Sequence, residues 1–273
     1  MSQGHAAAHA VWGEHTTPFD FFRQAAAVAE ADIRKLIHDP VELFTRMIQP
    51  ILWLGIFGQV FSRARAIPTG GLRYLDFMTP GVLAQSVLFG AIFYGISLIW
   101  ERDLGIVQKF LASPTPRSAL VLGRAVSSMA RSLCQAFLVY VLATFLGVNL
   151  HYGFFSLLGV AVAVMLGSAI FSTFSLIAAC IVKSRERFMG IGQVLTMPLF
   201  FASNAIYPLT MMPGWLRGIS VVNPLTYQVD ALRGLMIQGG ASNFGLVHDF
   251  AALLLAFAVL VAIATRLYPK IVT

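Results

Sequence analysis

Residues 132–182 form a run of 51 residues without a single Asp, Glu, Lys or Arg. As one helix this run would be about 77 Å long, because an α-helix rises about 1.5 Å per residue. The hydrocarbon core of a bilayer is only about 30 Å thick, so the run is expected to cross a membrane twice. The GVNLHYG segment at 147–153 is the natural turn between the two crossings.

Four further uncharged stretches occur at 47–62, 77–100, 188–216 and 250–265. The chain has 273 residues, of which 58% are hydrophobic and only 11% are charged, and this composition excludes an ordinary soluble enzyme. The pattern predicts an all-α polytopic membrane protein with six transmembrane helices. Their expected ranges are 41–62, 77–99, 118–147, 153–182, 188–208 and 247–268.

The ends of the chain and the basic residues predict domain organisation and orientation. Residues 1–18 are expected to be a disordered tail, 19–39 an amphipathic helix in the membrane interface, and 40–273 the transmembrane domain. Thirteen Lys and Arg residues lie in one set of alternate connections and five in the other. The positive-inside rule therefore predicts a multi-pass protein of the plasma (inner) membrane with both termini in the cytoplasm.

The sequence lacks the motifs of several classes of enzyme. The four lysines follow Arg, Gln, Val and Pro, so no Gly-Lys-Ser or Gly-Lys-Thr phosphate loop is present. The HExxH and GxSxG motifs are absent as well, and no catalytic or metal site is predicted. The net charge is +7, but the basic residues punctuate apolar runs and do not form a nucleic-acid surface. Active transport would need energy from another chain.

The connection after the second expected span contains an apolar stripe at helical spacing. Trp100, Leu104, Val107 and Leu111 recur every three or four residues, and the SPTP segment at 113–116 then ends the pattern. This predicts a short amphipathic helix on the inner face of the membrane. Such a helix can act as a lever, or it can be a simple interfacial connector, and periodicity alone favours the connector.

Two motifs in this sequence resemble those of ABC-2 type exporter permeases. The first is ERDLG at 101–105 followed by LASPTPR at 111–117 and LVLGR at 120–124, and the second is NPLTYQVDALR at 223–233. The similarity is greatest to the branch typified by daunorubicin-resistance and nodulation-factor export permeases. It covers about residues 20–270.

The resemblance implies a membrane half-unit that pairs with a second copy or with a homologous permease. It also implies separate nucleotide-binding ATPase subunits, which would bind ATP and Mg, and export of an amphipathic, lipid-like, drug-like or lipid-linked substrate. In that family the helix after the second span couples the permease to the ATPase. The role carries over to Glu101, Arg102, Asp103, Leu104, Gly105, Val107 and Leu111.

The residues of the second motif also predict a local structure independently of the resemblance. Asn223 is a good N-cap and Pro224 suits the first helical position, so a helix of about 15 residues should begin there. Such a helix is too short to span, and it predicts a re-entrant hairpin on the outer side. An outer gate and a structural lid are equally compatible with it. The residues concerned are Asn223, Pro224, Tyr227, Asp230 and Arg233.

Other side chains are candidates for a substrate path or for helix packing. Phe200, Phe201, Asn204 and Tyr207 follow Pro198 in the fifth expected span and could line a path for an apolar substrate. Arg117, Arg124 and Arg131 are seven residues apart and could meet headgroups or substrate, although pairing with Glu101, Asp103 or a partner subunit is favoured. Gly159, Ala163 and Gly167 predict close helix packing.

Taken with the resemblance, these patterns predict the non-enzymatic transmembrane subunit of an ATP-binding-cassette exporter. The alternative is a secondary transporter or a channel that works without an ATPase.

Overall fold

The computed structural model describes residues 40–64, 67–104, 117–182 and 184–267. Within these residues the chain is helical, and the only β-type contact is an isolated bridge between Leu150 and Ile237. The expected interfacial helix at 19–39 lies outside the described residues. The all-α class is therefore confirmed for the part of the chain that the structure describes.

Among the described residues, four helices are long and apolar enough to cross a membrane: α4 (Tyr74–Asp103), residues Val121–Phe145 of α6 (Arg117–Phe145), α7 (Phe154–Ile181) and α11 (Leu246–Leu267). Their bounds agree closely with four of the expected spans. The expected count of six spans is not confirmed.

The two remaining expected spans differ from regular membrane helices. The first comprises α2 (Pro40–Ile51), a π-helical segment at Leu52–Phe57 and α3 (Gly58–Ala64). Pro50 lies inside α2, and because proline lacks an N–H it disturbs the regular hydrogen-bond ladder directly before the π-helical turns. The expected range 41–62 has the right extent but is not one continuous α-helix.

The fifth expected span, 188–208, was wrong at its end. Helix α8 (Arg185–Phe201) has 17 residues and ends seven residues earlier than expected. Pro208 disfavours helix at the residue before it. The chain then forms the 3₁₀ turn η2 (Leu209–Met211), α9 (Gly214–Val222) and α10 (Pro224–Met236).

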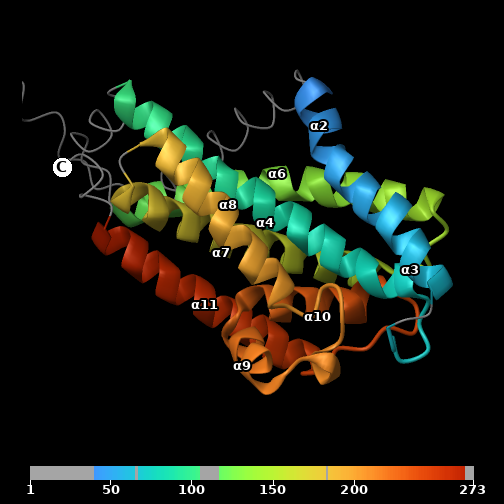
Figure 1. Cartoon of the computed structure of the whole chain (residues 1–273). Helices are drawn as coiled ribbons and strands as arrows, with labels where there is room; N and C mark the ends of the chain where they lie inside the picture. The colour runs from blue at the N-terminus through green and yellow to red at the C-terminus, as the bar shows by residue number, and fades with distance from the viewer. Residues whose placement is uncertain (1–39, 65–66, 105–116, 183, 268–273) are drawn as a thin grey trace, which may run out of the picture.

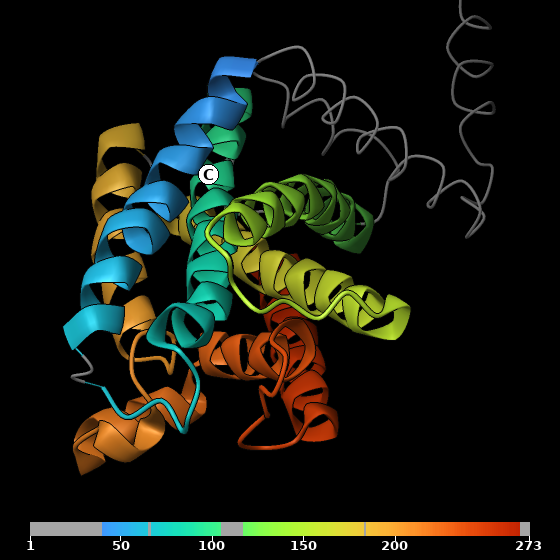
Figure 2. The ribbon, with the colours of Figure 1, turned by 90° about the vertical axis from the view of Figure 1, so that its right-hand side faces the viewer.

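Helices α4 and α7 form the centre of the bundle, and α6, α8, α10 and α11 pack around them (Figures 1 and 2). Figure 1 shows α9 and α10 at the end of the bundle opposite to the C-terminal end of α4. Most of the side chains of α10 are buried, whereas α9 presents Trp215, Ile219 and Val222 on the surface. The bundle thus has two distinct ends, each containing one of the sequence motifs.

Candidate functional site

The ERDLG motif begins in the last turn of α4. Glu101, Arg102 and Asp103 belong to α4, which runs without interruption from Tyr74, so these residues are not part of a separate helix after the second span, as was expected. The apolar sequence of α4 simply continues to Trp100, and nothing there breaks the helix. Leu104 is the C-cap and is 68% exposed. Gly105, Val107 and Leu111 lie outside the described residues.

Ionic contacts at this end join three helices. Arg124 of α6 forms an ion pair with Glu101 of α4. Arg185 of α8 contacts Asp103 of α4 with 2.8 Å between Nη2 and Oδ2, and its guanidinium carbon lies 3.6 Å from the ring centroid of Trp100. We call these five residues the charged cluster. The expected pairing of Arg124 with Glu101 is confirmed.

The second motif begins as expected. Asn223 is the N-cap of α10, and its side-chain oxygen accepts a hydrogen bond of 3.0 Å from the N–H of Leu225, while Pro224 occupies the first turn. The side-chain amide of Asn223 also donates to the Leu199 carbonyl of α8 at 2.7 Å. The hydroxyl of Tyr227 donates to the Val221 carbonyl of α9 at 2.6 Å. Asn223 and Tyr227 therefore connect α10 to its neighbours.

Asp230 is fully buried and accepts five hydrogen bonds. Two come from the backbone N–H groups of Asn243 and Phe244, at 2.6 and 3.0 Å. The others come from the side chains of Asn204, Ser242 and Asn243. The carboxylate thus holds the segment between α10 and α11 against α10, and the donors compensate for the loss of hydration.

Arg233 lies one turn after Asp230 and is 3% exposed. Its Nη1 is 3.9 Å from Oδ1 of Asp230, and its Nη2 donates to the Asn204 carbonyl at 2.7 Å. Its guanidinium carbon stands 3.9 Å from the ring centroid of Phe77 on α4. Burial lowers the pKa of Arg233 to about 10, and the charge of Asp230 opposes that shift, so the side chain is cationic at neutral pH. We call Asp230, Arg233 and their partners the α10 network.

Small residues on α7 allow α10 to approach closely. A Cβ atom at Gly167 would overlap the side-chain amide of Gln228, and one at Gly159 would lie 2.9 Å from Cδ1 of Leu235. Ala163 is fully buried on the same helix. The predicted role of Gly159, Ala163 and Gly167 in helix packing is confirmed.

The expected substrate-path residues are divided between the core and the surface. Phe200 is 1% exposed and contacts Trp53 edge to face, and Asn204 belongs to the α10 network. Both are inside the subunit. Phe201 is 45% exposed, and Tyr207 donates a hydrogen bond to its carbonyl. A role in a substrate path stays a prediction.

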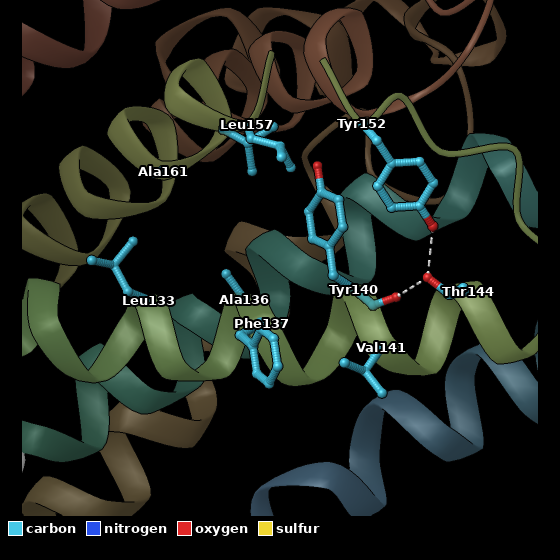
Figure 3. Close-up of a pocket in the computed structure, with 10 residues that line it drawn as sticks. Leu133, Ala136, Phe137, Tyr140, Val141, Thr144, Tyr152, Leu157 and Ala161 are labelled. Carbon is cyan, nitrogen blue, oxygen red and sulfur yellow. Dashed lines mark hydrogen bonds between the residues drawn. The ribbon is translucent and has the colours of Figure 1, made fainter. Parts of the chain in front are cut away.

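An apolar pocket of about 350 Å³ lies between α6 and α7 near the α10 end (Figure 3). Phe137, Val141 and Leu157 are among its lining residues. Its polar contacts include a hydrogen bond of 2.8 Å between the hydroxyls of Thr144 and Tyr152 and one of 2.8 Å from the Thr144 hydroxyl to the Tyr140 carbonyl. The buried hydroxyl of Tyr140 has no hydrogen-bond partner among the described residues. This pocket was not foreseen, since its side chains are ordinary residues of two apolar spans.

The fold defines a multi-pass membrane protein whose two sequence motifs lie at opposite ends of an apolar helical bundle. Comparison with known proteins identifies the family: residues 23–237 match the ABC-2 type transporter family. The chain therefore belongs to the ABC-2 type transporters and is the non-catalytic membrane subunit of a transporter.

Three relatives illustrate the range of the family. The transport permease ycf38 of Cyanophora paradoxa is 31% identical over 80% of this chain and 76% of its own length. The daunorubicin resistance ABC transporter permease protein DrrB1 of Streptomyces coeruleorubidus is 29% identical over 85% of this chain and 81% of its own. The inner membrane transport permease YadH of Escherichia coli K12 is 23% identical over 80% and 86%.

Proposed function

We propose that this chain is the transmembrane subunit of an ATP-driven exporter whose ATP and Mg²⁺ are bound by separate ATPase subunits. Membership of the ABC-2 family carries the proposal. The resemblance of the ERDLG segment to a coupling region gives the ATPase a place to act, at the C-terminal end of α4.

The charged cluster supports a route for coupling. The end of α4 is joined to α6 through Glu101 and Arg124, and to α8 through Asp103 and Arg185. A displacement of residues 101–111 by the ATPase would therefore pull on three helices together. Closure of the ATPase subunits would be transmitted to the spans and would open a path at the interface between two permease subunits.

Orientation, assembly and substrate belong to the same proposal. The charged cluster would face the cytoplasm of a plasma membrane, with both termini on that side, and α9 and α10 would face outward. A second copy or a homologous permease would complete the path. The substrate would be amphipathic, lipid-like or drug-like, and the name of the Streptomyces relative, which refers to daunorubicin resistance, supports an efflux function.

Copurification tests the central claim. The full chain, solubilised from its own membrane, is expected to bring down an ATPase subunit, and the purified permease alone should not hydrolyse ATP. Leu104→Asp should weaken this association, because a charge replaces an exposed apolar side chain next to the coupling segment. Transport that continues in cells lacking any associated ATPase would instead establish the secondary transporter or channel.

Cysteine labelling tests the orientation. In a variant in which Cys134 and Cys180 are replaced by Ala, Ala241→Cys should react with an impermeant thiol reagent applied to intact cells, whereas Lys109→Cys should react only after permeabilisation. The opposite pattern would place the charged cluster outside and would contradict the coupling proposal.

A further inference from the structure

A polar cleft lies between α2, α4 and α6, apart from both the charged cluster and the α10 network. Its volume is about 350 Å³, which is in the range of small-molecule sites. Its walls include Arg46 of α2, Tyr94 of α4, and Arg131 and Gln135 of α6. The helix ribbons that form it lie side by side in Figure 2.

Two guanidinium groups reach this cleft within the bundle. The guanidinium carbon of Arg131 is 5.0 Å from the ring centroid of Tyr94. Arg46 lies against Gly90 of α4, where an added Cβ would be 3.4 Å from its Nη1. Arg131 is about 21 Å along α6 from its first residue, well inside a spanning helix. Cationic side chains at such depth usually mark a ligand or ion site.

Gln135 supplies an independent observation. Its side chain is 5% exposed and lines the cleft, and its Nε2 has no hydrogen-bond partner among the described residues. A buried amide donor without an acceptor costs free energy, and an acceptor atom of a ligand in the cleft would remove that cost.

Two serine hydroxyl groups of the cleft already donate their protons to backbone carbonyls. Ser97 donates its hydroxyl proton to the Tyr94 carbonyl at 2.7 Å, and Ser86 donates to the Val82 carbonyl at 2.8 Å. None of the described residues that line the cleft is acidic. The donor groups on its walls include the guanidinium groups of Arg46 and Arg131 and the side-chain amides of Gln49 and Gln135, a set that suits an anion.

The cleft also has an apolar edge. Phe89 and Phe93 line it, are half-buried, and stack with ring centroids 6.1 Å apart. Thr45, also on the wall, is exposed. An amphiphile could place its headgroup beside Arg131 and Gln135 and extend its chain along the Phe pair toward the lipid-facing surface.

We propose that this cleft binds the phosphate-bearing headgroup of a lipid-like amphiphile through Arg46, Arg131 and Gln135. Guanidinium groups recognise phosphate with paired hydrogen bonds, and each has five N–H donors, so protein partners do not prevent either arginine from also contacting a ligand. The amphiphile is a lipid of the surrounding bilayer or a separate transported molecule, and both carry the same headgroup chemistry.

Native mass spectrometry of the full chain in an uncharged detergent tests the proposal with three probes: dihexanoyl phosphatidic acid, dihexanoylglycerol and inorganic phosphate. Phosphatidic acid should fill one tight site, and each of the other probes should bind at least about tenfold more weakly, because each lacks either the headgroup or the tail. Equal binding of inorganic phosphate would overturn the assignment to an amphiphile, and equal binding of dihexanoylglycerol would overturn the headgroup contact.

Arg131→Gln and Gln135→Leu should each weaken the binding of phosphatidic acid by about tenfold, whereas the exposed Arg266→Gln on α11 should bind like the wild type. The change to Leu keeps the side chain close in size and removes the unpartnered amide, so this variant should fold. Wild-type affinity in both cleft variants would overturn the proposal. The measurement needs no ATPase, so it is independent of the proposed function.

Nanodiscs distinguish the two sources. If a bilayer lipid occupies the cleft, discs of phosphatidylglycerol should reduce phosphatidic acid binding relative to discs of phosphatidylcholine, and Gln135→Leu should abolish the difference. Equal binding in both discs identifies a separate amphiphile as the occupant. If Gln135→Leu shows the same difference in phosphatidic acid binding between the two kinds of disc as the wild type, the anionic lipid binds elsewhere and the proposed site is wrong.

Discussion

The charged cluster and the α10 network, at the two ends of this bundle, are built in opposite ways. The Asp230 side chain is fully buried and accepts five hydrogen bonds, and Arg233 beside it is 3% exposed. In the charged cluster, the side chains of Glu101 and Arg124 are 31% and 15% exposed, and those of Asp103 and Arg185 are 39% and 37% exposed. A buried charge that loses its partners is costly, whereas exposed ion pairs contribute little and can be exchanged.

The difference indicates which end can change shape during a transport cycle. The α10 network joins α4, α10 and the segments around Asn204 and Asn243, and breaking it leaves charge without compensation. The charged cluster can separate and reform with a small change in free energy. The end that contains Glu101 therefore suits a moving contact, and the end that contains Asp230 suits a fixed framework.

Asp230→Ala should have the largest effect, because it leaves Arg233 buried beside an empty space. We expect the free energy of unfolding to fall by about 3 to 5 kcal/mol, the usual cost of removing one partner of a buried ion pair. Thermal unfolding of the purified chain in detergent measures it. Asp103→Ala is the matched control and should keep a melting temperature near that of the wild type. If Asp230→Ala and Asp103→Ala lose the same amount of stability, the two ends of the bundle do not differ in how strongly they are held.

Gly167→Ala should weaken the fixed end by displacing α10 from α7. The new methyl group would overlap Gln228, and overpacking of this kind costs about 1 to 3 kcal/mol. Gly190 on α8 is the control, because a Cβ there meets nothing within 4 Å. The same unfolding measurement should show no loss for Gly190→Ala. If Gly167→Ala is as stable as the control, α10 is not held as closely as described.

Asn223→Ala should cost about 1 to 2 kcal/mol, because it removes the N-cap of α10 together with the hydrogen bond to the Leu199 carbonyl of α8. Assembly with the ATPase should persist, since the change is at the other end. Transport should fall or become leaky if α10 is part of a gate. Normal transport by a folded variant would favour the structural lid, which is the other interpretation of this helix.

The sequence was sufficient to predict a helix where one local pattern of residues determines that helix. Uncharged runs located α4, α6, α7 and α11 closely, since a spanning helix needs little more than length and apolar composition. Asn223 and Pro224 predicted the start of α10, because capping depends on adjacent residues alone. The spacing of Gly159 and Gly167 indicated a packing face without identifying α10 as the partner.

Contacts between distant segments could not be predicted in the same way. Asn204 was a candidate for a substrate path, and its burial beside Asp230 depends on the bend after α8 and on the return of the chain at 242–244. The role of Asn243 was missed, and the only sequence signal was its place in a polar turn after two glycines. The cleft needs three helices to meet, so Arg131 alone did not reveal it.

Glu101→Ala should have the smallest effect on stability and a large effect on transport, and this contrast tests the moving end directly. The ion pair with Arg124 is partly exposed, so its loss should change the free energy of unfolding by about 0 to 1 kcal/mol. If the pair transmits force from the ATPase to α6, the variant should assemble normally yet lose substrate-stimulated ATP hydrolysis and export together. Both activities are measured in membranes at equal abundance of the complex.

Arg124→Gln should reproduce this phenotype, because it removes the other half of the same contact, and Arg266→Gln should not. Wild-type export by Glu101→Ala and Arg124→Gln would show that the ion pair is structural only, and coupling would then have to pass through Asp103 and Arg185. Loss of assembly in Glu101→Ala would give a third result, that Glu101 contributes to docking of the ATPase. Because the pair joins α4 to α6, and α6 contributes Arg131 to the polar cleft, a coupling defect should also alter the response of ATP hydrolysis to phosphatidic acid.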